Sequence, residues 1–319
     1  MKKLRIAYIV WKQYQRRSEL LAQRLDANIK FMPHLFKAKY IRPLDYLLKL
    51  ISTFKYIIQH QPDIVIVQAP PLFGAIAPML MRVPYVIDAH NATIQGFWLK
   101  FPSTEYLLNR SSAILVHNNE IFHIAKSLIA HNKIVSILDP LEVIIKQNKQ
   151  RLNNQVLVIC SFSSDEPIDI IIETIRRLPD YTFVITADIS KLCPLQRQLL
   201  HEQRNVCLTG FLPTEEYQSL LVSSLAALVL TTRDSTQPSG ACEALSSDTQ
   251  LIISETSLTK ELFADWAILV DNSVESIVSA IQSLELKAID LSNYRNLWEI
   301  SVNQGIDQLY SLLYSSNRL

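Results

Sequence analysis

One segment of the sequence combines a charged pair, small residues and a glutamate in an order that suits an anionic ligand. It runs Arg233-Asp234-Ser235-Thr236-Gln237-Pro238-Ser239-Gly240-Ala241-Cys242-Glu243-Ala244. Small residues at a helix start let a phosphate approach the unpaired N–H groups of the first turn, where the helix dipole is positive. We therefore expect Ser239, Gly240 and Ala241 to bind a diphosphate, and Gly240 is the residue best suited to close backbone approach.

Charged residues lie on both sides of these small residues. Arg233 stands where a cation would neutralise a diphosphate, and Asp234 and Glu243 place carboxylates near the same ligand. A simpler interpretation is a capped helix start with a solvated Glu243 and a surface Arg233 paired with Asp234. The residues alone leave both interpretations open.

A histidine follows another expected strand, in Val86-Ile87-Asp88-Ala89-His90-Asn91. A side chain just past the carboxyl end of a parallel strand is well placed to contact a phosphate or a hydroxyl group. We expect His90 to be catalytic and Asn91 to lie beside it on the acceptor side. A surface histidine without a function is the alternative.

Aromatic and basic residues are interleaved after the first expected strand. Arginine pairs with phosphate or carboxylate groups, and aromatic rings stack on sugars and on cations. We expect this loop to face an acceptor that carries sugar rings or a phosphate. The residues concerned are Trp11, Tyr14, Arg16 and Arg17.

The elements that would position these residues follow from the apolar pattern. Short runs that are apolar at every position alternate with amphipathic stretches, which is typical of parallel strands covered by helices on both faces. Helical spacing follows Asp165-Glu166-Pro167 and follows Ser273, each expected to cap a helix. The sequence predicts an α/β protein with doubly wound sheets. The expected strands are 4–10, 64–68, 85–88, 113–117, 156–161, 182–186, 205–209, 226–231, 251–254 and 267–270.

The chain is long enough for two domains, each with a core of its own. Residues 145–154 are polar, and a new apolar run begins at Val156. We place the boundary there and expect two Rossmann-like domains, 1–147 and 148–319, with the last helix able to pack back on the first. Ligands of such paired domains bind in the cleft between the carboxyl ends of the two sheets.

Charge and cysteine content exclude several classes of function. The formal net charge is +1 and 19% of the residues are charged, so no basic stripe indicates nucleic acid as a partner. Four cysteines lie in or beside apolar runs without a Cys-x-x-Cys pair or a histidine cluster, and we expect buried, reduced thiols and no metal site. They are Cys160, Cys193, Cys207 and Cys242.

No segment is expected to cross a membrane. The first apolar run, residues 6–10, is too short for a signal peptide. The uncharged stretch 64–81 approaches the length that a bilayer needs, but its three prolines favour a strand, a loop and a short buried helix. We expect a cytoplasmic protein.

Residues 37–55 are both basic and apolar, so a helix here could lie on the anionic inner face of a membrane. A helix packed on its own sheet, with its lysines in water, explains the pattern equally well. The basic residues are Lys37, Lys39, Arg42, Lys49 and Lys55.

The order of these motifs resembles that of family 4 glycosyltransferases, enzymes of the GT-B type that use nucleotide-activated sugars. The match is strongest at residues 228–245, and weaker correspondences extend it over nearly the full chain. The resemblance implies that residues 1–147 bind the acceptor and residues 148–319 bind the nucleotide sugar. It also implies retaining transfer of a hexosyl unit from a nucleotide diphosphate sugar to a hydroxyl group of a saccharide or lipid-linked acceptor, in cell-surface polysaccharide or glycolipid synthesis. Such enzymes need no metal or other cofactor, because helix N-termini and cationic side chains stabilise the leaving diphosphate.

By the same resemblance, Glu243 binds the ribose hydroxyls of the donor and His90 faces the reacting sugar. Ser235 stands where many members have a glutamate that contacts the sugar, so Asp234 is expected to take that role. The turn at residues 160–167 lacks the Gly-Arg and the lysine that often contact the phosphates, and Arg233 would replace them.

These departures keep two other hypotheses open. One is a non-catalytic GT-B-like partner protein, which nucleotide binding would argue against. The other is a nucleotide-sugar epimerase on the same fold, which needs acidic catalytic residues beside the anomeric carbon that the sequence does not assign. A fold alone does not decide among them.

Overall fold

The computed structural model describes residues 4–36, 38–101, 103–129, 133–144, 151–285 and 290–315, apart from the side chain of residue 39. Contacts divide the chain into two compact units, Met1–Pro140 with Trp298–Leu319 (unit 1) and Leu141–Leu297 (unit 2). The boundary expected at 147/148 lies outside the described residues. In the structure the first division falls at Pro140, and most of the last helix belongs to unit 1.

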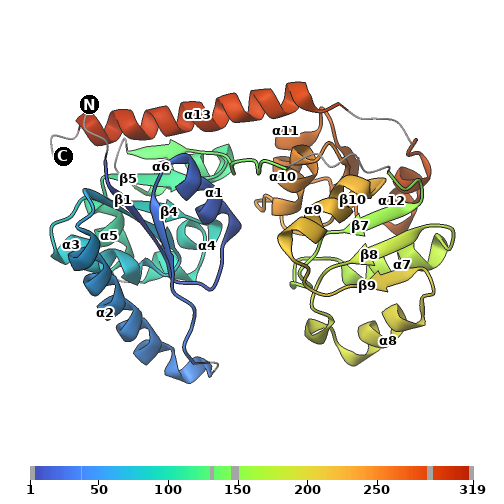
Figure 1. Ribbon diagram of the computed structural model, residues 1–319, viewed down its shortest axis with the longest axis horizontal. Helices are drawn as coiled ribbons and strands as arrows, with labels where there is room; N and C mark the ends of the chain where they lie inside the picture. Colours follow the sequence, from blue (N-terminus) through green and yellow to red (C-terminus); the bar gives the residue numbers. More distant parts are fainter. Residues whose placement is uncertain are drawn as a thin grey trace. The chain divides into compact units, whose positions relative to one another are not determined.

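Unit 1 is built around a six-stranded parallel sheet with the order β2-β1-β3-β4-β5-β6 (Figure 1). The four central strands are those that the apolar runs predict, whereas the two edge strands were not expected. Edge strands are short or half exposed here, so they lack a continuous apolar run. The strands are β1 Ile6–Val10, β2 Asn28–Phe31, β3 Ile64–Ala69, β4 Tyr85–Ala89, β5 Ala113–Val116 and β6 Ile134–Ser136.

Helices cover this sheet, with α13 on the side opposite to α2 (Figure 1). The stretch 64–81 folds as expected, into β3, a loop and two short helices. No helix of the described residues is long and apolar enough to span a membrane. The helices of unit 1 are α1 Arg16–Arg24, α2 Arg42–His60, α3 Ile76–Leu80, α4 Asn91–Ile94, α5 Thr104–Arg110, α6 Asn119–Leu128 and α13 Ser292–Ser315, with 3-10 turns η1 Lys39–Ile41, η2 Leu72–Ala75 and η3 Phe97–Lys100.

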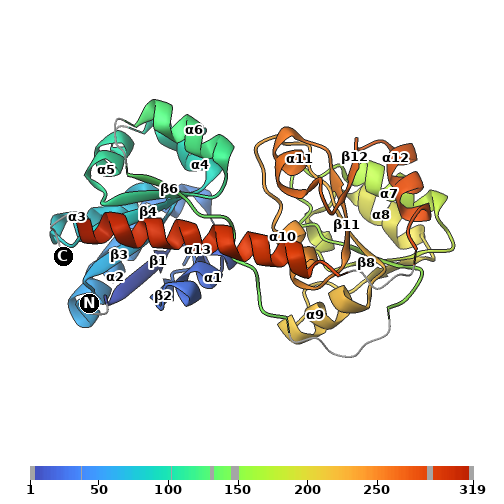
Figure 2. The same cartoon turned by 90° about the horizontal axis from the view of Figure 1, so that it is seen from above.

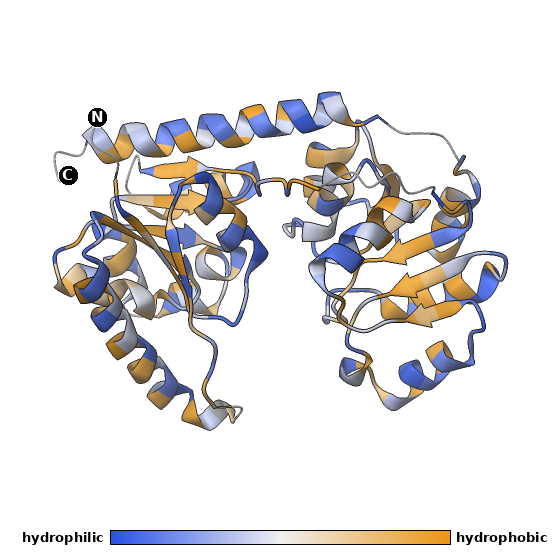
Figure 3. Ribbon diagram, viewed as in Figure 1, coloured by the Kyte–Doolittle hydropathy of each residue, from blue (hydrophilic) through white to orange (hydrophobic). Residues whose placement is uncertain are grey.

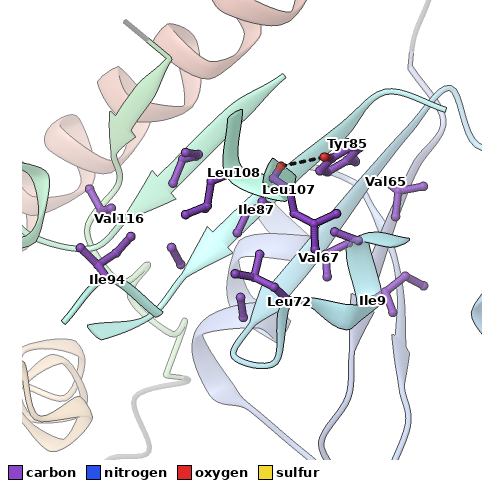
Figure 4. Close-up of a cluster of buried hydrophobic side chains, with 14 of the residues drawn as sticks. Ile9, Val65, Val67, Leu72, Tyr85, Ile87, Ile94, Leu107, Leu108 and Val116 are labelled. Carbon is purple, nitrogen blue, oxygen red and sulfur yellow. Dashed lines mark hydrogen bonds between the residues drawn. The ribbon is translucent and has the colours of Figure 1, made fainter. Parts of the chain in front are cut away.

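The four central strands of unit 1 are buried on both faces, and one core cluster lies on one of these faces. Ile9, Val67 and Ile87 come from three adjacent strands and belong to one cluster with Leu107 and Leu108 of α5, which lie beside Ile87 (Figure 4). Burying a side chain of this size stabilises the fold by about 1.5–3 kcal/mol. This cluster fixes the strands whose carboxyl ends carry the polar residues considered below.

Unit 2 repeats the architecture with the strand order β12-β11-β10-β7-β8-β9, again all parallel. All six strands overlap the expected runs, and most of their residues are apolar (Figure 3). The strands are β7 Gln155–Val158, β8 Thr182–Ile185, β9 Val206–Leu208, β10 Ala226–Val229, β11 Gln250–Ser254 and β12 Ile268–Val270. The helices are α7 Ile168–Arg177, α8 Pro194–Glu202, α9 Thr214–Ser223, α10 Ser239–Ser246, α11 Ser257–Phe263 and α12 Val274–Gln282, with the 3-10 turn η4 Ile189–Lys191.

Two helix caps were expected in unit 2, and one of them is confirmed. Ser273 caps α12 as expected, accepting a hydrogen bond from Ser276 N. Helix α7 starts after Pro167 without a side-chain cap, because the carboxylates of Asp165 and Glu166 bind other groups.

The final helix completes unit 1 and runs over its sheet (Figure 2). Trp298 donates from Nε1 to the Asp139 carbonyl at 2.9 Å, and Val302, Leu309 and Leu313 are buried. At Gly305 a Cβ would lie 2.6 Å from the Ser136 carbonyl oxygen, so only glycine allows this close approach to β6.

The cysteines depart from expectation. Cys242 is buried and Cys160 is half-buried, but Cys193 and Cys207 are exposed. Cys193 precedes α8, where its sulfur accepts a hydrogen bond from Gln196 N, and Cys207 lies on the edge strand β9. The expectation of four buried thiols was wrong because neither a helix cap nor an edge strand needs to be covered.

Candidate functional site

The carboxyl edge of the unit 1 sheet contains a buried ionic cluster centred on Asp88, the fourth residue of β4. Its two oxygens accept hydrogen bonds from Tyr8 Oη at 2.6 Å and from Arg17 Nε at 3.2 Å. Arg17, in the first turn of α1, also donates from Nη1 to Asp139 Oδ1 at 2.6 Å. The side chains of Arg17 and Asp88 are 3% and 1% exposed, so water does not screen this pair.

Burial alone would raise the pKa of Asp88. The positive charge of Arg17, the nearby His90 ring and the hydrogen bond from Tyr8 outweigh that cost and hold the pKa well below its usual range. Burial also raises the pKa of Tyr8 well above its usual value, since a phenolate beside Asp88 would be a second buried anion. Asp88 is therefore a fixed negative charge, and Tyr8 is a fixed neutral donor.

Two histidines lie at this edge. His90 Nε2 is 3.6 Å from Asp88 Oδ2, within ion-pair reach but longer than a hydrogen bond. The rings of His90 and His117 have centroids 6.0 Å apart. Burial lowers the pKa of His117 to about 4, so this ring is neutral at physiological pH.

Several buried polar atoms at this edge have no hydrogen-bond partner among the described residues. Such atoms are few in folded proteins, and a group of them indicates where water or a ligand binds. Three of these six atoms are donors, and the two histidine nitrogens donate in one of their tautomers, which suits a ligand rich in hydroxyl or phosphate oxygens. They are Arg17 Nη2, both amide atoms of Gln68, His90 Nε2, His117 Nδ1 and Asn118 Nδ2.

Two of the residues expected on the acceptor side are placed differently. Trp11 is 2% exposed, donates from Nε1 to Thr53 Oγ1 at 3.2 Å, and belongs to the apolar core because its side chain continues the inward face of β1. Arg17 is not an exposed contact but the buried partner of Asp88. Only its unpaired Nη2 remains for a ligand.

The other three lie nearer to expectation. Tyr14 is 53% exposed and donates from Oη to Glu19 Oε2 at 2.9 Å. Arg16 is the first residue of α1 and is half-buried, and Asn91 is the first residue of α4, directly after His90. Of the acceptor-side residues, Asn91 is thus adjacent to the histidine, whereas Tyr14 contacts Glu19 of α1 and packs its ring against Phe31 of β2, with centroids 5.8 Å apart.

Unit 2 carries the small-residue segment as expected, with α10 beginning at Ser239 after the residue Pro238. Ser239 is exposed, whereas Gly240 and Ala241 are buried. A Cβ at Gly240 would lie 2.9 Å from Ile159 Cγ2 and 3.0 Å from Val229 Cγ2. The glycine thus serves the close packing of α10 on its sheet, and a ligand need not be invoked to explain it.

Glu243 is buried rather than solvated, with 6% exposure, and its Oε2 accepts a hydrogen bond from Tyr217 Oη of α9. The tyrosine fixes the orientation of the carboxylate one turn inside α10.

The charged pair before α10 does not form the surface ion pair considered above. Arg233 is 62% exposed in its side chain, and its Nη1 lies 4.0 Å from Asp165 Oδ1 in the turn before α7. Asp234 is exposed in the loop after β10.

Hydrogen bonds of short polar side chains join the strand ends of unit 2. Thr231 N donates to Ser254 Oγ at 2.8 Å, and Asn272 Nδ2 donates to the Thr231 carbonyl at 3.0 Å. Thr231 Oγ1 donates to Asp165 Oδ2 at 3.2 Å. The ends of β10, β11 and β12 and the turn after β7 are thereby held in register beside the start of α10.

Four residues of these two sites were not predicted from the sequence: Gln68, Asp88, His117 and Tyr217. The first three had a signal, since each is a polar residue within or just after a fully apolar run at a strand end. Tyr217 had none, because its partner lies 26 residues away on another helix. Among the described residues, no group of three His, Cys, Asp or Glu side chains could hold a metal ion.

Comparison with known proteins identifies the fold of the chain. No family model matches the chain, and no curated protein matches its sequence. Anabaena HepE in complex with UDP and glucose is similar in structure, with a TM-score of 0.68 at 13% identity over 98% of this chain and 100% of that one. Sucrose-phosphate synthase from Thermosynechococcus elongatus has a TM-score of 0.69 at 12% identity, with the same coverage of both chains.

The UDP-GlcNAc 2-epimerase of Methanocaldococcus jannaschii is also similar, with a TM-score of 0.57 at 13% identity over 90% of this chain and 94% of that one. Two parallel six-stranded sheets with flanking helices, in the arrangement of these proteins, are the GT-B fold. The expected fold class is confirmed.

Proposed function

We propose that this chain is a glycosyltransferase that moves a hexosyl unit, with retention of configuration, from a nucleotide diphosphate sugar to a hydroxyl acceptor. The observation that supports it most is the group of buried, unpaired donors around His90 at the carboxyl edge of unit 1. Hydroxyl-rich ligands supply the acceptors that such donors lack. The complex of a protein of similar fold with UDP and glucose makes UDP the first nucleotide to test.

In this proposal unit 2 binds the donor. Its diphosphate lies at the start of α10, where the N–H groups of Ser239, Gly240 and Ala241 and the exposed Arg233 stabilise the leaving charge. Glu243, oriented by Tyr217, accepts hydrogen bonds from the ribose hydroxyls. Asp234 contacts the transferred sugar.

Unit 1 binds the sugar side of the reaction. His90 contacts the reacting group, Asp88 and Tyr8 orient it, and the remaining donors bind hydroxyl groups of a saccharide or lipid-linked acceptor. Asn91, Tyr14 and Arg16 extend this surface. The product would enter cell-surface polysaccharide or glycolipid synthesis.

Calorimetry with UDP tests the donor site. Wild type should bind UDP, and Glu243→Ala should bind about 2 kcal/mol more weakly, because a charge-assisted pair of hydrogen bonds is lost. Glu215→Ala on the exposed surface of α9 is the matched control and should bind as wild type. Equal affinity of wild type and Glu243→Ala would remove the ribose assignment, and no affinity for UDP, GDP or ADP would favour the non-catalytic partner protein.

Turnover separates the two enzyme classes that share this fold. Incubation with UDP-glucose and cell-envelope extracts should yield a glycosylated product with the anomeric configuration of the donor, seen by NMR. His90→Ala should lower turnover while UDP affinity stays as in wild type. Conversion of UDP-GlcNAc to its 2-epimer without an acceptor would support the epimerase instead.

We also propose that unit 1 docks on the anionic inner face of a membrane, where a lipid-linked acceptor is found. Helix α2 buries the polar residues Asp45, Lys49 and Thr53 and leaves an apolar stripe exposed (Figure 3). Lys49 is therefore not a lipid contact, since its Nζ binds Asp45 and the Trp11 carbonyl. The exposed residues are Leu44, Leu47, Leu48, Ile51 and Ile58.

Charge favours lipid over a second copy of the chain as the occupant of this stripe. Asp45 is the sole acidic residue of the sequence between 37 and 60, and it is buried. The helix presents the exposed Lys55 and the half-buried Arg42, which would repel a second copy and attract anionic lipid. Lys37 and the side chain of Lys39 lie outside the described residues.

Flotation with vesicles tests the docking. Wild type should float with phosphatidylcholine vesicles that contain phosphatidylglycerol and much less with phosphatidylcholine alone. Leu47→Glu and Lys55→Glu should each weaken flotation several-fold, and Phe211→Glu, at a 95% exposed phenylalanine of unit 2, should not. Equal flotation of all four proteins would exclude α2 as the contact.

A further inference from the structure

The turn between β7 and α7 has the shape of an anion-binding site. Phe162 has a positive φ of 55°, the left-handed region, and lies between Ser161 and Ser163. A left-handed residue between two N–H groups turns both of them toward one point, which forms a concave nest for an anion. Turns of this kind at the carboxyl end of a parallel strand bind phosphate groups.

The chain itself supplies the anion in this structure. The carboxylate of Glu166 accepts hydrogen bonds from Ser161 N and from Ser163 N, each at 3.0 Å, and from Ser161 Oγ at 3.1 Å. Three donors to one carboxylate are a charge-assisted set of the strong kind. The donors of the nest are therefore occupied before any ligand arrives.

The nest opens on a cavity of about 490 Å³, large enough for a diphosphate group. Glu166 and Ser163 line it on one side, and Lys191 and Gln196 line it from the segment after β8. Lys191 Nζ donates to the Ser161 carbonyl at 3.0 Å, which places a cation beside the nest. The cavity thus has a cation and a set of N–H donors, with the Glu166 carboxylate between them and a ligand.

We propose that Glu166 is an autoinhibitory occupant of this nest and competes with a diphosphate group for the N–H groups of Ser161 and Ser163. The nature of the full ligand rests on the proposed function: it is the donor whose diphosphate we place at the start of α10, beside which this turn lies because Thr231 Oγ1 donates to Asp165 Oδ2 at 3.2 Å. The competition itself does not, because it depends only on the donors and on the carboxylate that fills them. An anion enters after the Glu166 side chain rotates outward, and the affinity of the turn is lowered by the cost of that rotation.

Three variants separate this competition from a general effect of charge. Glu166→Ala vacates the nest and should bind both inorganic pyrophosphate and UDP about tenfold more tightly than wild type, since each 1.4 kcal/mol of competing hydrogen bonds is a factor of ten. Glu166→Gln keeps the shape with a weaker acceptor and should fall between the two. Asp169→Ala removes the same charge from the first turn of α7, in the same cavity, and leaves the nest filled, so it should bind as wild type.

Amide NMR signals of Ser161 and Ser163 give the second readout, and both should shift with pyrophosphate in Glu166→Ala. Tighter pyrophosphate binding without UDP binding would uphold the competition and overturn the proposed donor. Equal or weaker pyrophosphate affinity in both Glu166 variants overturns the competition, as does an equal gain in Asp169→Ala. Glu166→Gln decides the matter if Glu166→Ala does not fold.

Discussion

At the residue scale, the buried charge of Asp88 orients polar side chains at the carboxyl edge of the unit 1 sheet. Asp88 has its oxygens bound by Tyr8 and Arg17, so it cannot accept a proton from a ligand and acts by position. His90 is the histidine of the pair with solvent access, at 23% exposure of its side chain. His117 beside it is buried and neutral, so in the proposed reaction His90 is the ring that would contact the ligand.

The neutral state of His117 makes the stability of unit 1 depend on pH. Its pKa falls from 6.5 to about 4 on folding, so below pH 6.5 the unfolded chain binds a proton that the folded protein does not. Wild type should lose about 2 kcal/mol of unfolding free energy from this group between pH 7 and pH 5. His117→Gln does not titrate, and urea denaturation should show a correspondingly smaller loss. The exposed His123→Gln serves as control, and a loss as small in that variant would refute the assignment to His117.

Sequence could suggest His90 but not its surroundings. A histidine after an apolar run is visible in the sequence, whereas the burial of Arg17 depends on partners 71 and 122 residues away. Trp11 and Arg17 share a polar-looking loop with Tyr14, and nothing local tells a core residue from an exposed one. Local patterns do not encode which side chains a fold will cover.

At the element scale, the apolar runs identified every central strand and failed at the edges of unit 1. Residues of β2 alternate between exposed and half-buried, and β6 has three residues, so neither has a continuous apolar run. The start of α10 was found because small residues are a local signal. The reason for Gly240 was not found, since its neighbours Ile159 and Val229 come from two strands.

Gly240→Ala tests what that glycine does. Alanine favours a helix by about 1 kcal/mol, but a Cβ against Ile159 and Val229 should cost about 1–3 kcal/mol. We expect a net loss of about 1 kcal/mol in the stability of unit 2, measured by thermal denaturation. Ser239→Ala, at the exposed first residue of α10, should be neutral. Full stability of Gly240→Ala together with weaker UDP binding would show instead that the glycine serves the ligand.

At the scale of the whole molecule, two separate segments of the chain form unit 1. Residues 298–315 of α13 return after unit 2 and bury Trp298, Val302, Leu309 and Leu313. We expected a last helix able to pack back on the first domain. That expectation did not include Gly305, whose contact with β6 sets how closely the helix approaches.

A chain that stops after Leu297 tests how much unit 1 depends on that return. Each buried leucine or valine contributes about 1.5–3 kcal/mol, so the truncated protein should lose most of the stability of unit 1. Hydrogen exchange should then be fast in β1 to β6 and unchanged in β7 to β12. Val302→Ala should show a smaller effect of the same kind, and Ile300→Ala, at an exposed residue, should show none. Slow exchange in β1 to β6 of the truncated chain would contradict the dependence.

The return of α13 also fixes an order of events during synthesis. A ribosome makes residues 1–140 first, then all of unit 2, and only afterwards the segment that covers the sheet of unit 1. Unit 2 is contiguous in sequence and can fold as it leaves the ribosome. Residues 1–140 meanwhile expose the apolar surface that α13 covers later. The half of the molecule that is made first is thus completed last, and during translation it is the half that most needs a chaperone.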